Sequence, residues 1–104
     1  MRWKMQETVV KFIEKYNLSC DEKIRYMDLV SEVGELGKEI IKGCEYGKQQ
    51  YTKTPNSENE LGDCLFSLFA LCYEMNIDAK SALDNALAKY EKRFNLKGEI
   101  SSGQ

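Results

Sequence analysis

Residues 60–75 read ELGDCLFSLFALCYEM, and this stretch decides the fold class. Its central part, residues 64–73, carries no charge and is apolar on every side of a helical wheel. A helix of this kind is buried all round, because no face of it prefers water. The uncharged run is about half as long as a membrane span. We therefore expect a core helix from just after Pro55 to about Met75, capped by Thr54 or Ser57.

The chain before this helix predicts another one from about residue 20 to Gly43. Ser19 and Glu22 form a capping-box pattern at its start, and a glycine is typical at a helix end. Its apolar residues recur at intervals of three and four, as an amphipathic helix requires. They are Met27, Val30, Val33, Leu36, Ile40 and Ile41. Residues 43–56 then hold two glycines and the single proline, which indicates a long loop between the two helices.

Two further helices complete the pattern at the ends of the chain. An amphipathic stretch covers about residues 2–17. Another follows a short turn at residues 76–78, with Asp78 as its N-cap, and ends near Phe94. Residues 95–104 have little apolar content, so we expect a frayed tail. The prediction is a single all-α domain of four helices over residues 1–94.

Length and composition exclude several kinds of protein. With 104 residues, 42% hydrophobic and 31% charged, the chain fits one globular domain. A net charge of −2 argues against a broad nucleic-acid-binding surface. The sequence has no histidine, which removes histidine bases, histidine-activated nucleophiles and histidine-ligated metals. Its four cysteines form no CxxC pair, and we see no signal peptide or membrane span. We therefore expect a cytoplasmic protein with reduced, mostly buried thiols.

Carboxylates gather on the two central helices. Glu32, Glu35 and Glu39 lie within an arc of about 60° on the first of them. Glu60 and Asp63 lie one turn apart at the start of the second. Like charges at this spacing destabilise a helix, so their place at the rim of apolar faces favours a bound cation. Oxygen ligands without histidine indicate Mg²⁺ or Mn²⁺. A solvated acidic face, or charge that favours the N-terminal end of a helix, remains the alternative.

Cationic and aromatic candidates lie nearer the ends of the chain. Asn85, Lys89 and Arg93 form a stripe at spacings of four on the last helix and could meet anionic oxygens. Trp3 could stack on a base. The alternatives are a solvated helix face for the stripe and a core position for the tryptophan. The sequence has no glycine-rich phosphate loop of the GxxxxGKS type, so a nucleotide would be held through a metal.

Three segments carry a resemblance to a known family. They are DLVSEVGELGKEIIKG at residues 28–43, ENELGDCLFSLFALCYEMNIDAKSAL at residues 58–83 and KYEKRF at residues 89–94. In its ExxE and ExxD pairs and their surroundings, the chain resembles the MazG-like nucleotide pyrophosphohydrolases of the all-α NTP pyrophosphatase superfamily. The resemblance covers about residues 25–94, and it implies a fold like a four-helix bundle.

The resemblance also implies hydrolysis of a nucleoside triphosphate to the monophosphate and pyrophosphate. It assigns Mg²⁺ to the two acidic pairs, which are Glu32, Glu35, Glu60 and Asp63. Lys89 and Arg93 match the KxxxR stretch that the family associates with the phosphates. Since histidine is absent, Glu35 is the candidate that takes the proton of the attacking water, with Glu32 beside it. Ser31 and Asn59 stand where the family often has a further acid.

Two rival functions and an assembly state complete the expectations. A related branch of the superfamily cleaves phosphoribosyl-ATP, so this substrate is one alternative. A helical interaction or regulatory module, whose acidic face binds a partner without metal, is the alternative from another class. Neighbouring helices in a 104-residue chain cannot cover every face of the apolar helix. We therefore expect a homodimer or a dimer of dimers.

Overall fold

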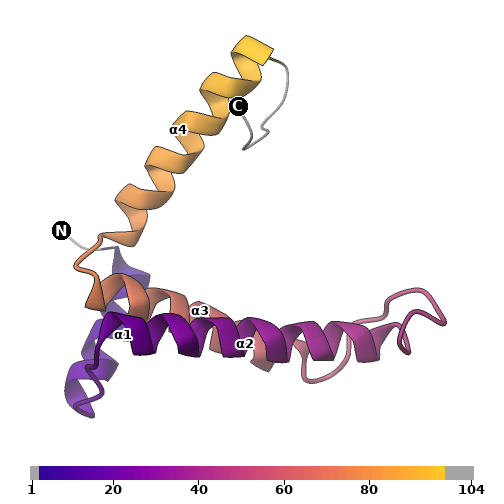
Figure 1. Cartoon of the computed structure of the whole chain (residues 1–104). Coiled ribbons are helices and arrows are strands. Elements are labelled where there is room, and N and C mark those ends of the chain that lie inside the picture. The colour runs from indigo at the N-terminus through magenta and orange to yellow at the C-terminus, as the bar shows by residue number, and fades with distance from the viewer. Residues whose placement is uncertain (1–2, 98–104) are drawn as a thin grey trace.

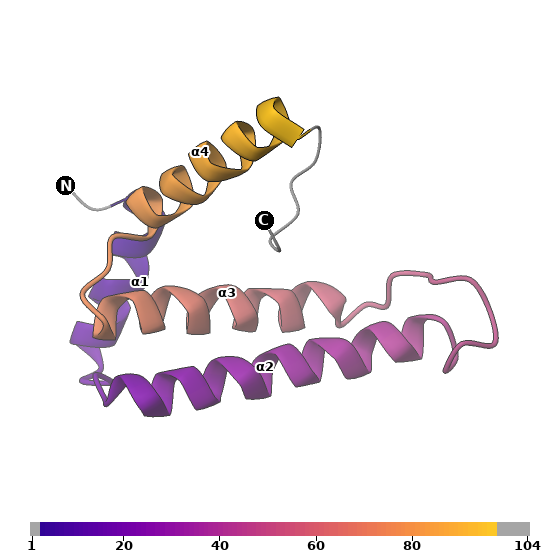
Figure 2. The same cartoon turned by 45° about the horizontal axis from the view of Figure 1, so that its top comes forward.

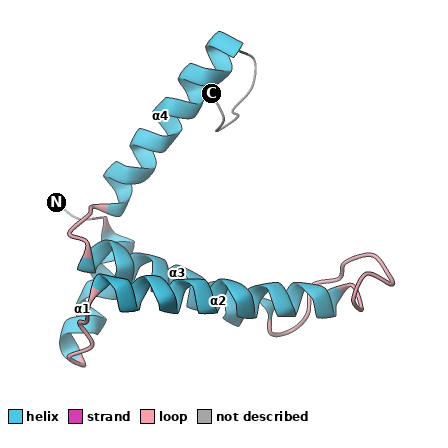
Figure 3. Cartoon of the chain, viewed as in Figure 1, coloured by secondary structure: helices cyan, strands magenta, loops and turns pink. Residues whose placement is uncertain are grey.

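The computed structural model describes residues 3–97, and four α-helices make up most of them. The helices are α1 (Lys4–Lys15), α2 (Glu22–Gly43), α3 (Ser57–Glu74) and α4 (Ala79–Lys97). No strand occurs within residues 3–97 (Figure 3). The prediction of an all-α chain with four helices is confirmed. α4 continues to Lys97, past its predicted end near Phe94, and the rest of the expected tail lies outside the described residues.

The start of α2 corrects the capping-box prediction. The N-cap is Asp21, whose side chain accepts a hydrogen bond from the backbone N–H of Lys23 at 2.7 Å. Ser19 does not cap the helix, because its hydroxyl donates to Glu74 Oε1 at 2.9 Å. Serine and aspartate are similarly good N-caps. The distant glutamate therefore decides which of the two residues takes that position.

The predicted cap is wrong for α3, whereas the residue predicted to precede α4 is in its expected place. The N-cap of α3 is Asn56, without a side-chain cap hydrogen bond, so neither Thr54 nor Ser57 occupies this place as predicted. Asp78 directly precedes α4, at its predicted position, and its carboxylate accepts a hydrogen bond from the Ser81 hydroxyl at 2.7 Å. This hydrogen bond is the main reason why the pKa of Asp78 lies below its ordinary value.

The α2–α3 pair forms the centre of the chain. The two helices lie side by side in opposite directions and are joined by the loop of residues 44–56 (Figure 2). α1 packs against α3 at the end opposite this loop. Among residues 3–97, the fully buried apolar residues are few, namely Val10 and Ile13 of α1 and Ala70 of α3. One chain therefore holds only a small core of its own.

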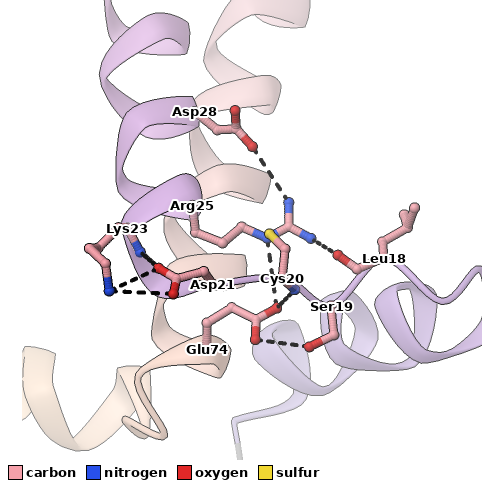
Figure 4. A network of polar contacts seen from close by, with 8 residues as sticks. All are labelled: Leu18, Ser19, Cys20, Asp21, Lys23, Arg25, Asp28 and Glu74. Atoms are coloured by element: carbon pink, nitrogen blue, oxygen red, sulfur yellow. Dashed lines mark hydrogen bonds and ion pairs between the residues drawn. The ribbon is translucent and has the colours of Figure 1, made fainter.

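Polar contacts fasten the connection between α1 and α2 to the C-terminal end of α3 (Figure 4). The carboxylate of Glu74 accepts hydrogen bonds from the Ser19 hydroxyl and the Cys20 backbone N–H, both at 2.9 Å. Arg25 places its Nε 3.8 Å from Glu74 Oε2 and donates from Nη2 to the Leu18 carbonyl at 2.5 Å. The side chains of Arg25 and Glu74 are each only 9% exposed. This buried ion pair helps to fix the start of α2 beside the end of α3.

A buried glutamine holds the turn that leads into α4. Gln6 of α1 donates from Nε2 to the Ile77 carbonyl at 2.9 Å and accepts at Oε1 from the Ala79 backbone N–H at 2.7 Å. Its side chain is almost completely buried. A buried amide of this kind is stable only while both of its partners are in place. Gln6 therefore ties the first residues of α4 to α1.

Beyond this turn, α4 points away from the other helices, so the four helices of one chain do not close into a bundle (Figure 1). The Cα radius of gyration is 16.8 Å, whereas a compact chain of this length has about 13 Å. The expected burial of α3 on every face is therefore wrong for a single chain. Its buried residues are Ser57, Ser67 and Ala70, while Leu61 and Leu65 are half exposed.

The structure also tests the expected burial of the cysteines and the expected lack of a membrane span. All four cysteines are free thiols, and each is half-buried, whereas we expected most of them to be buried. Among residues 3–97, no helix combines the length and the apolar character that crossing a membrane requires.

Candidate metal and substrate site

Three carboxylates from two helices converge on the facing sides of α2 and α3. One oxygen each from Glu32 of α2 and from Glu60 and Asp63 of α3 lie within 4.8 Å of one another. Glu60 and Asp63 share a face of α3 because they are one turn apart. Because α2 and α3 pack against each other, Glu32 of α2 lies opposite this face. Glu32 and Glu60 are half-buried, and Asp63 is exposed.

The electrostatics of this cluster favour a cation. The pKa of Glu32 is raised above its ordinary value, first by partial burial and then by the negative charges of its neighbours. These neighbours are Asp63, Glu60, Glu35 and Asp28, in order of decreasing effect. Three carboxylate oxygens at this separation repel one another. They are also the ligands that Mg²⁺ and Mn²⁺ prefer. The donor set of this structure therefore fits a divalent cation of this kind.

Glu35 lies one turn further along α2 and is outside the group of three. Its side chain is exposed and, together with Glu60, lines a cavity of about 400 Å³. The cavity lies between the C-terminal part of α2 and the N-terminal end of α3. The remaining lining residues are Lys38, Glu39, Ile41, Lys42, Tyr46 and Asn56. Three carboxylates, two ammonium groups and an amide thus surround a space that adjoins the cluster.

Glu39 is the third carboxylate on the predicted stripe of α2. It contacts the 44–56 loop rather than the other carboxylates. Its side chain is buried and accepts a hydrogen bond from the Thr54 hydroxyl at 2.5 Å. This hydrogen bond is the largest cause of a pKa below the ordinary value, and Asn56 and Lys42 lower it further. Lys42 Nζ lies 3.9 Å from Glu39 Oε1. Glu39 therefore anchors the end of the 44–56 loop and is not part of the metal-ligand group.

Comparison with known proteins identifies the family of the chain. The family model described as the MazG nucleotide pyrophosphohydrolase domain matches residues 21–96, which include the whole acidic cluster. The chain belongs to the MazG family. No curated protein and no solved structure shows a significant match to it. The suspected MazG-like relationship is therefore confirmed, and the match extends from the N-cap of α2 into α4.

Two asparagines next to the cluster were not predicted as functional residues. Asn56 Nδ2 donates to Glu60 Oε1 at 3.0 Å, and Asn59 Nδ2 donates to Asn56 Oδ1 at 3.1 Å. The first contact joins residues four positions apart and the second joins residues three apart, spacings that place side chains together at a helix start. The spacing of Asn56, Asn59 and Glu60 in the MazG domain sequence could have indicated these contacts. We did not consider it because the search concentrated on acidic residues.

The candidates on α4 lie apart from the carboxylates of their own chain. Asn85, Lys89 and Arg93 belong to the helix that points away from α2 and α3 (Figure 1), and none of them lines the cavity. Lys89 places its ammonium group 5.2 Å from the centre of the Tyr90 ring. The single MazG chain therefore does not bring the KxxxR stretch to the acidic pairs.

Trp3 precedes α1 and contacts an aromatic residue of α3. Its ring packs edge-on against Phe69, with 6.0 Å between the ring centres. The side chain is half-buried and does not line the cavity beside Glu35. In the single MazG chain, Trp3 occupies the packing position that was the alternative to base stacking.

Proposed function

We propose that this MazG domain is a Mg²⁺-dependent nucleoside triphosphate pyrophosphohydrolase, which can also use Mn²⁺. It cleaves an NTP or dNTP to the monophosphate and pyrophosphate by attack of water at the α-phosphorus. The observation that carries this proposal is the meeting of Glu32, Glu60 and Asp63 within 4.8 Å on two helices of a MazG-family chain. A mere solvated acidic face would not require carboxylates from two helices to converge.

Each acidic side chain has a role in this proposal. Glu32, Glu60 and Asp63 hold the cation, with Glu35 next to them on the open side. Mg²⁺, when bound, offsets the charge of the phosphate oxygens and orients the water. Glu35 takes the proton of the attacking water, because it is exposed, lines the cavity and lies outside the group of three. Glu32 assists by keeping a negative charge beside it.

The substrate in this proposal meets cationic and polar side chains around the cluster. Lys89 and Arg93 stabilise the negative charge that grows on the pyrophosphate leaving group, and Asn85 contacts the rest of the nucleotide. Because α4 points away from its own carboxylates, these residues act on the cluster of a second copy. The cavity of about 400 Å³ beside Glu35 offers space for part of the nucleotide.

We further propose that the protein is a homodimer or a dimer of dimers in the cytoplasm. The single chain leaves large apolar side chains exposed on every helix, including Val33 of α2, Leu65 of α3 and Leu87 of α4. A second copy that covers these faces would close the four-helix-bundle-like arrangement. It would also bring α4 of one chain toward the acidic cluster of the other.

A product analysis in ¹⁸O-labelled water tests the reaction. The purified protein is incubated with Mg²⁺ and a panel of NTPs, dNTPs and phosphoribosyl-ATP. We expect at least one substrate to yield a monophosphate that carries the label and unlabelled pyrophosphate. Release of diphosphate and orthophosphate would contradict attack at the α-phosphorus. Cleavage of phosphoribosyl-ATP alone would favour the related branch of the superfamily.

Variants test the assigned residues in the same assay. Asp63→Asn removes a proposed metal ligand and Glu35→Gln removes the proposed base, so we expect both to lose nearly all activity. Glu58→Gln is the matched control, because Glu58 lies in the first turn of the same helix but outside the acidic group. Equal activity of all three variants would contradict the proposed site.

A further inference from the structure

The residue that begins α3 uses its side chain in an unusual way. Asn56 is the N-cap of α3, yet its side chain caps no backbone group. An N-cap asparagine normally accepts a hydrogen bond from a backbone N–H in the first turn. Here Oδ1 accepts instead from Asn59 Nδ2 at 3.1 Å, and Nδ2 donates to Glu60 Oε1 at 3.0 Å. The amide is thus committed to side chains rather than to the backbone N–H groups of the first turn, and it also contacts the Glu39 carboxylate and lowers its pKa.

The contact has a consequence for Glu60. One carboxylate oxygen of Glu60 is engaged by the amide, which restricts the rotation of the side chain and leaves its other oxygen for a cation. Metal-ligating carboxylates are commonly oriented by such hydrogen bonds. An amide suits this position because it donates without adding charge. A lysine would compete with the cation, and a further carboxylate would add to the repulsion around Glu32 and Asp63.

Asn59 extends the same chain of hydrogen bonds. Its amide orients Asn56 by donating to Oδ1, so that Nδ2 of Asn56 points at Glu60. Asn59 does not itself touch a member of the acidic group through a hydrogen bond in the part of the chain that the structure describes. Its effect on the cluster therefore has to pass through Asn56.

We propose that Asn56 and Asn59 are positioning residues that orient Glu60 as a metal ligand, with Asn59 acting through Asn56. The inference rests on the proposed function in that it takes Glu60 as a ligand of the divalent cation. It adds two hydrogen bonds in series at the start of α3, from Asn59 to Asn56 and from Asn56 to Glu60, which we call the amide relay. The acidic pairs alone do not provide this orientation of Glu60.

Binding of Mn²⁺ to the full chain, followed by electron paramagnetic resonance of the free ion, tests the relay without any substrate. Asn56→Ser places another residue type that is favoured at an N-cap, but the shorter serine side chain cannot reach Glu60. We expect the Mn²⁺ dissociation constant, measured where both proteins are fully folded, to rise about tenfold, while the metal-free melting temperature reports separately the loss of the contact between Asn56 and Glu39. Asn59→Ala should weaken Mn²⁺ binding less. The double variant should bind as Asn56→Ser does, because both residues act in one chain.

Asn95→Ser on α4 is the control and should leave Mn²⁺ binding unchanged. The relay is overturned if Asn56→Ser binds Mn²⁺ as tightly as the wild type. Additive effects of the two substitutions would overturn the action of Asn59 through Asn56. If the wild type binds Mn²⁺ through this relay but cleaves no nucleotide, the proposed function fails and the relay stands. If nucleotides are cleaved and Asn56→Ser binds normally, the relay alone fails.

Discussion

At the scale of single residues, the fold opposes the ionisation of Glu32 in the acidic cluster. Partial burial and neighbouring carboxylates raise its pKa above 4.5. Glu32→Gln removes this disfavoured charge, so we expect the metal-free melting temperature to be unchanged or higher. Mg²⁺ should stabilise the wild type by about 2.7 kcal/mol at a hundredfold excess over its dissociation constant, and the variant much less. Thermal melts with and without Mg²⁺ measure both effects.

The matched control for this experiment is again Glu58→Gln, which leaves the three clustered carboxylates intact. Its Mg²⁺-dependent shift should equal that of the wild type. If Mg²⁺ raises the melting temperature of Glu32→Gln as much as that of the wild type, Glu32 is not a ligand.

Thr54 and Glu39 provide a prediction about pH. The Thr54 hydroxyl is the main cause of the lowered pKa of Glu39. A carboxylate whose pKa is lower in the folded state stabilises the fold above its unfolded pKa, and this contribution is lost as the pH falls through the folded value. We expect Thr54→Val to be less stable than the wild type at neutral pH. The difference should narrow as the pH falls below 4.5.

Urea unfolding over a series of pH values measures this difference. In a Glu39→Gln background the carboxylate is gone, so the effect of Thr54→Val should no longer depend on pH. A stability gap that is constant with pH in the wild-type background would show that the hydrogen bond to Glu39 is not its source.

At the scale of the helices, Gly43 lets the end of α2 and the following loop approach each other closely. A Cβ at this position would lie 2.6 Å from the Thr52 carbonyl oxygen and 2.6 Å from Tyr51 Cε1. The Thr52 N–H also donates to the Gly43 carbonyl at 2.9 Å. Because part of the obstacle is backbone, Gly43→Ala has to displace the loop. We expect it to lower the free energy of unfolding by about 1–3 kcal/mol, measured by urea titration.

Gly34 in the same helix is the control for this substitution. A Cβ there would meet nothing within 4 Å. Alanine also favours a helix interior over glycine, so Gly34→Ala should stabilise the protein by about 0.5–1 kcal/mol. If Gly43→Ala were equally stabilising, the close approach of the loop would be incorrect.

At the scale of the whole molecule, the exposed apolar side chains predict self-association. Leu65 and Leu68 of α3 are 50% and 46% exposed in the single chain. Surfaces of this kind are usually covered by a partner. We expect light scattering to report at least a dimer at micromolar concentration. Leu65→Glu should dissociate it, whereas Lys11→Glu on the exposed side of α1 should not. A stable wild-type monomer would contradict the proposed assembly.

The direction of α4 leads to a second prediction about the assembly. If Lys89 acts on the acidic cluster of another copy, Glu35→Gln and Lys89→Gln chains should complement each other. Each parent is expected to be nearly inactive. In randomly formed dimers of the two co-expressed chains, half are mixed and contain one intact site, so about a quarter of wild-type activity should return. If the co-expressed variants are as inactive as each variant alone, Lys89 acts on the site of its own chain or does not act on the site at all.

Features that depend on neighbouring residues could be predicted from the sequence alone. The four helices and the loop of residues 44–56 follow from apolar periodicity, from Gly43 and Pro55, and from the turn before Asp78. The spacing of Glu60 and Asp63 places both on one helix face, because helical geometry is set by residues one turn apart. The family relationship was readable for the same reason, since its motifs are short and local.

Features that depend on distant partners were decided only by the tertiary structure. Glu74 draws Ser19 away from the cap of α2, Thr54 draws Glu39 into the loop, and Gln6 ties α1 to the start of α4. The first and last of these contacts join residues more than fifty positions apart, so no local pattern records them. The apolar character of α3 was readable, but whether its own chain or another covers it depends on where α4 points. A sequence determines how much apolar surface a helix must bury, whereas the packing of the helices determines what buries it.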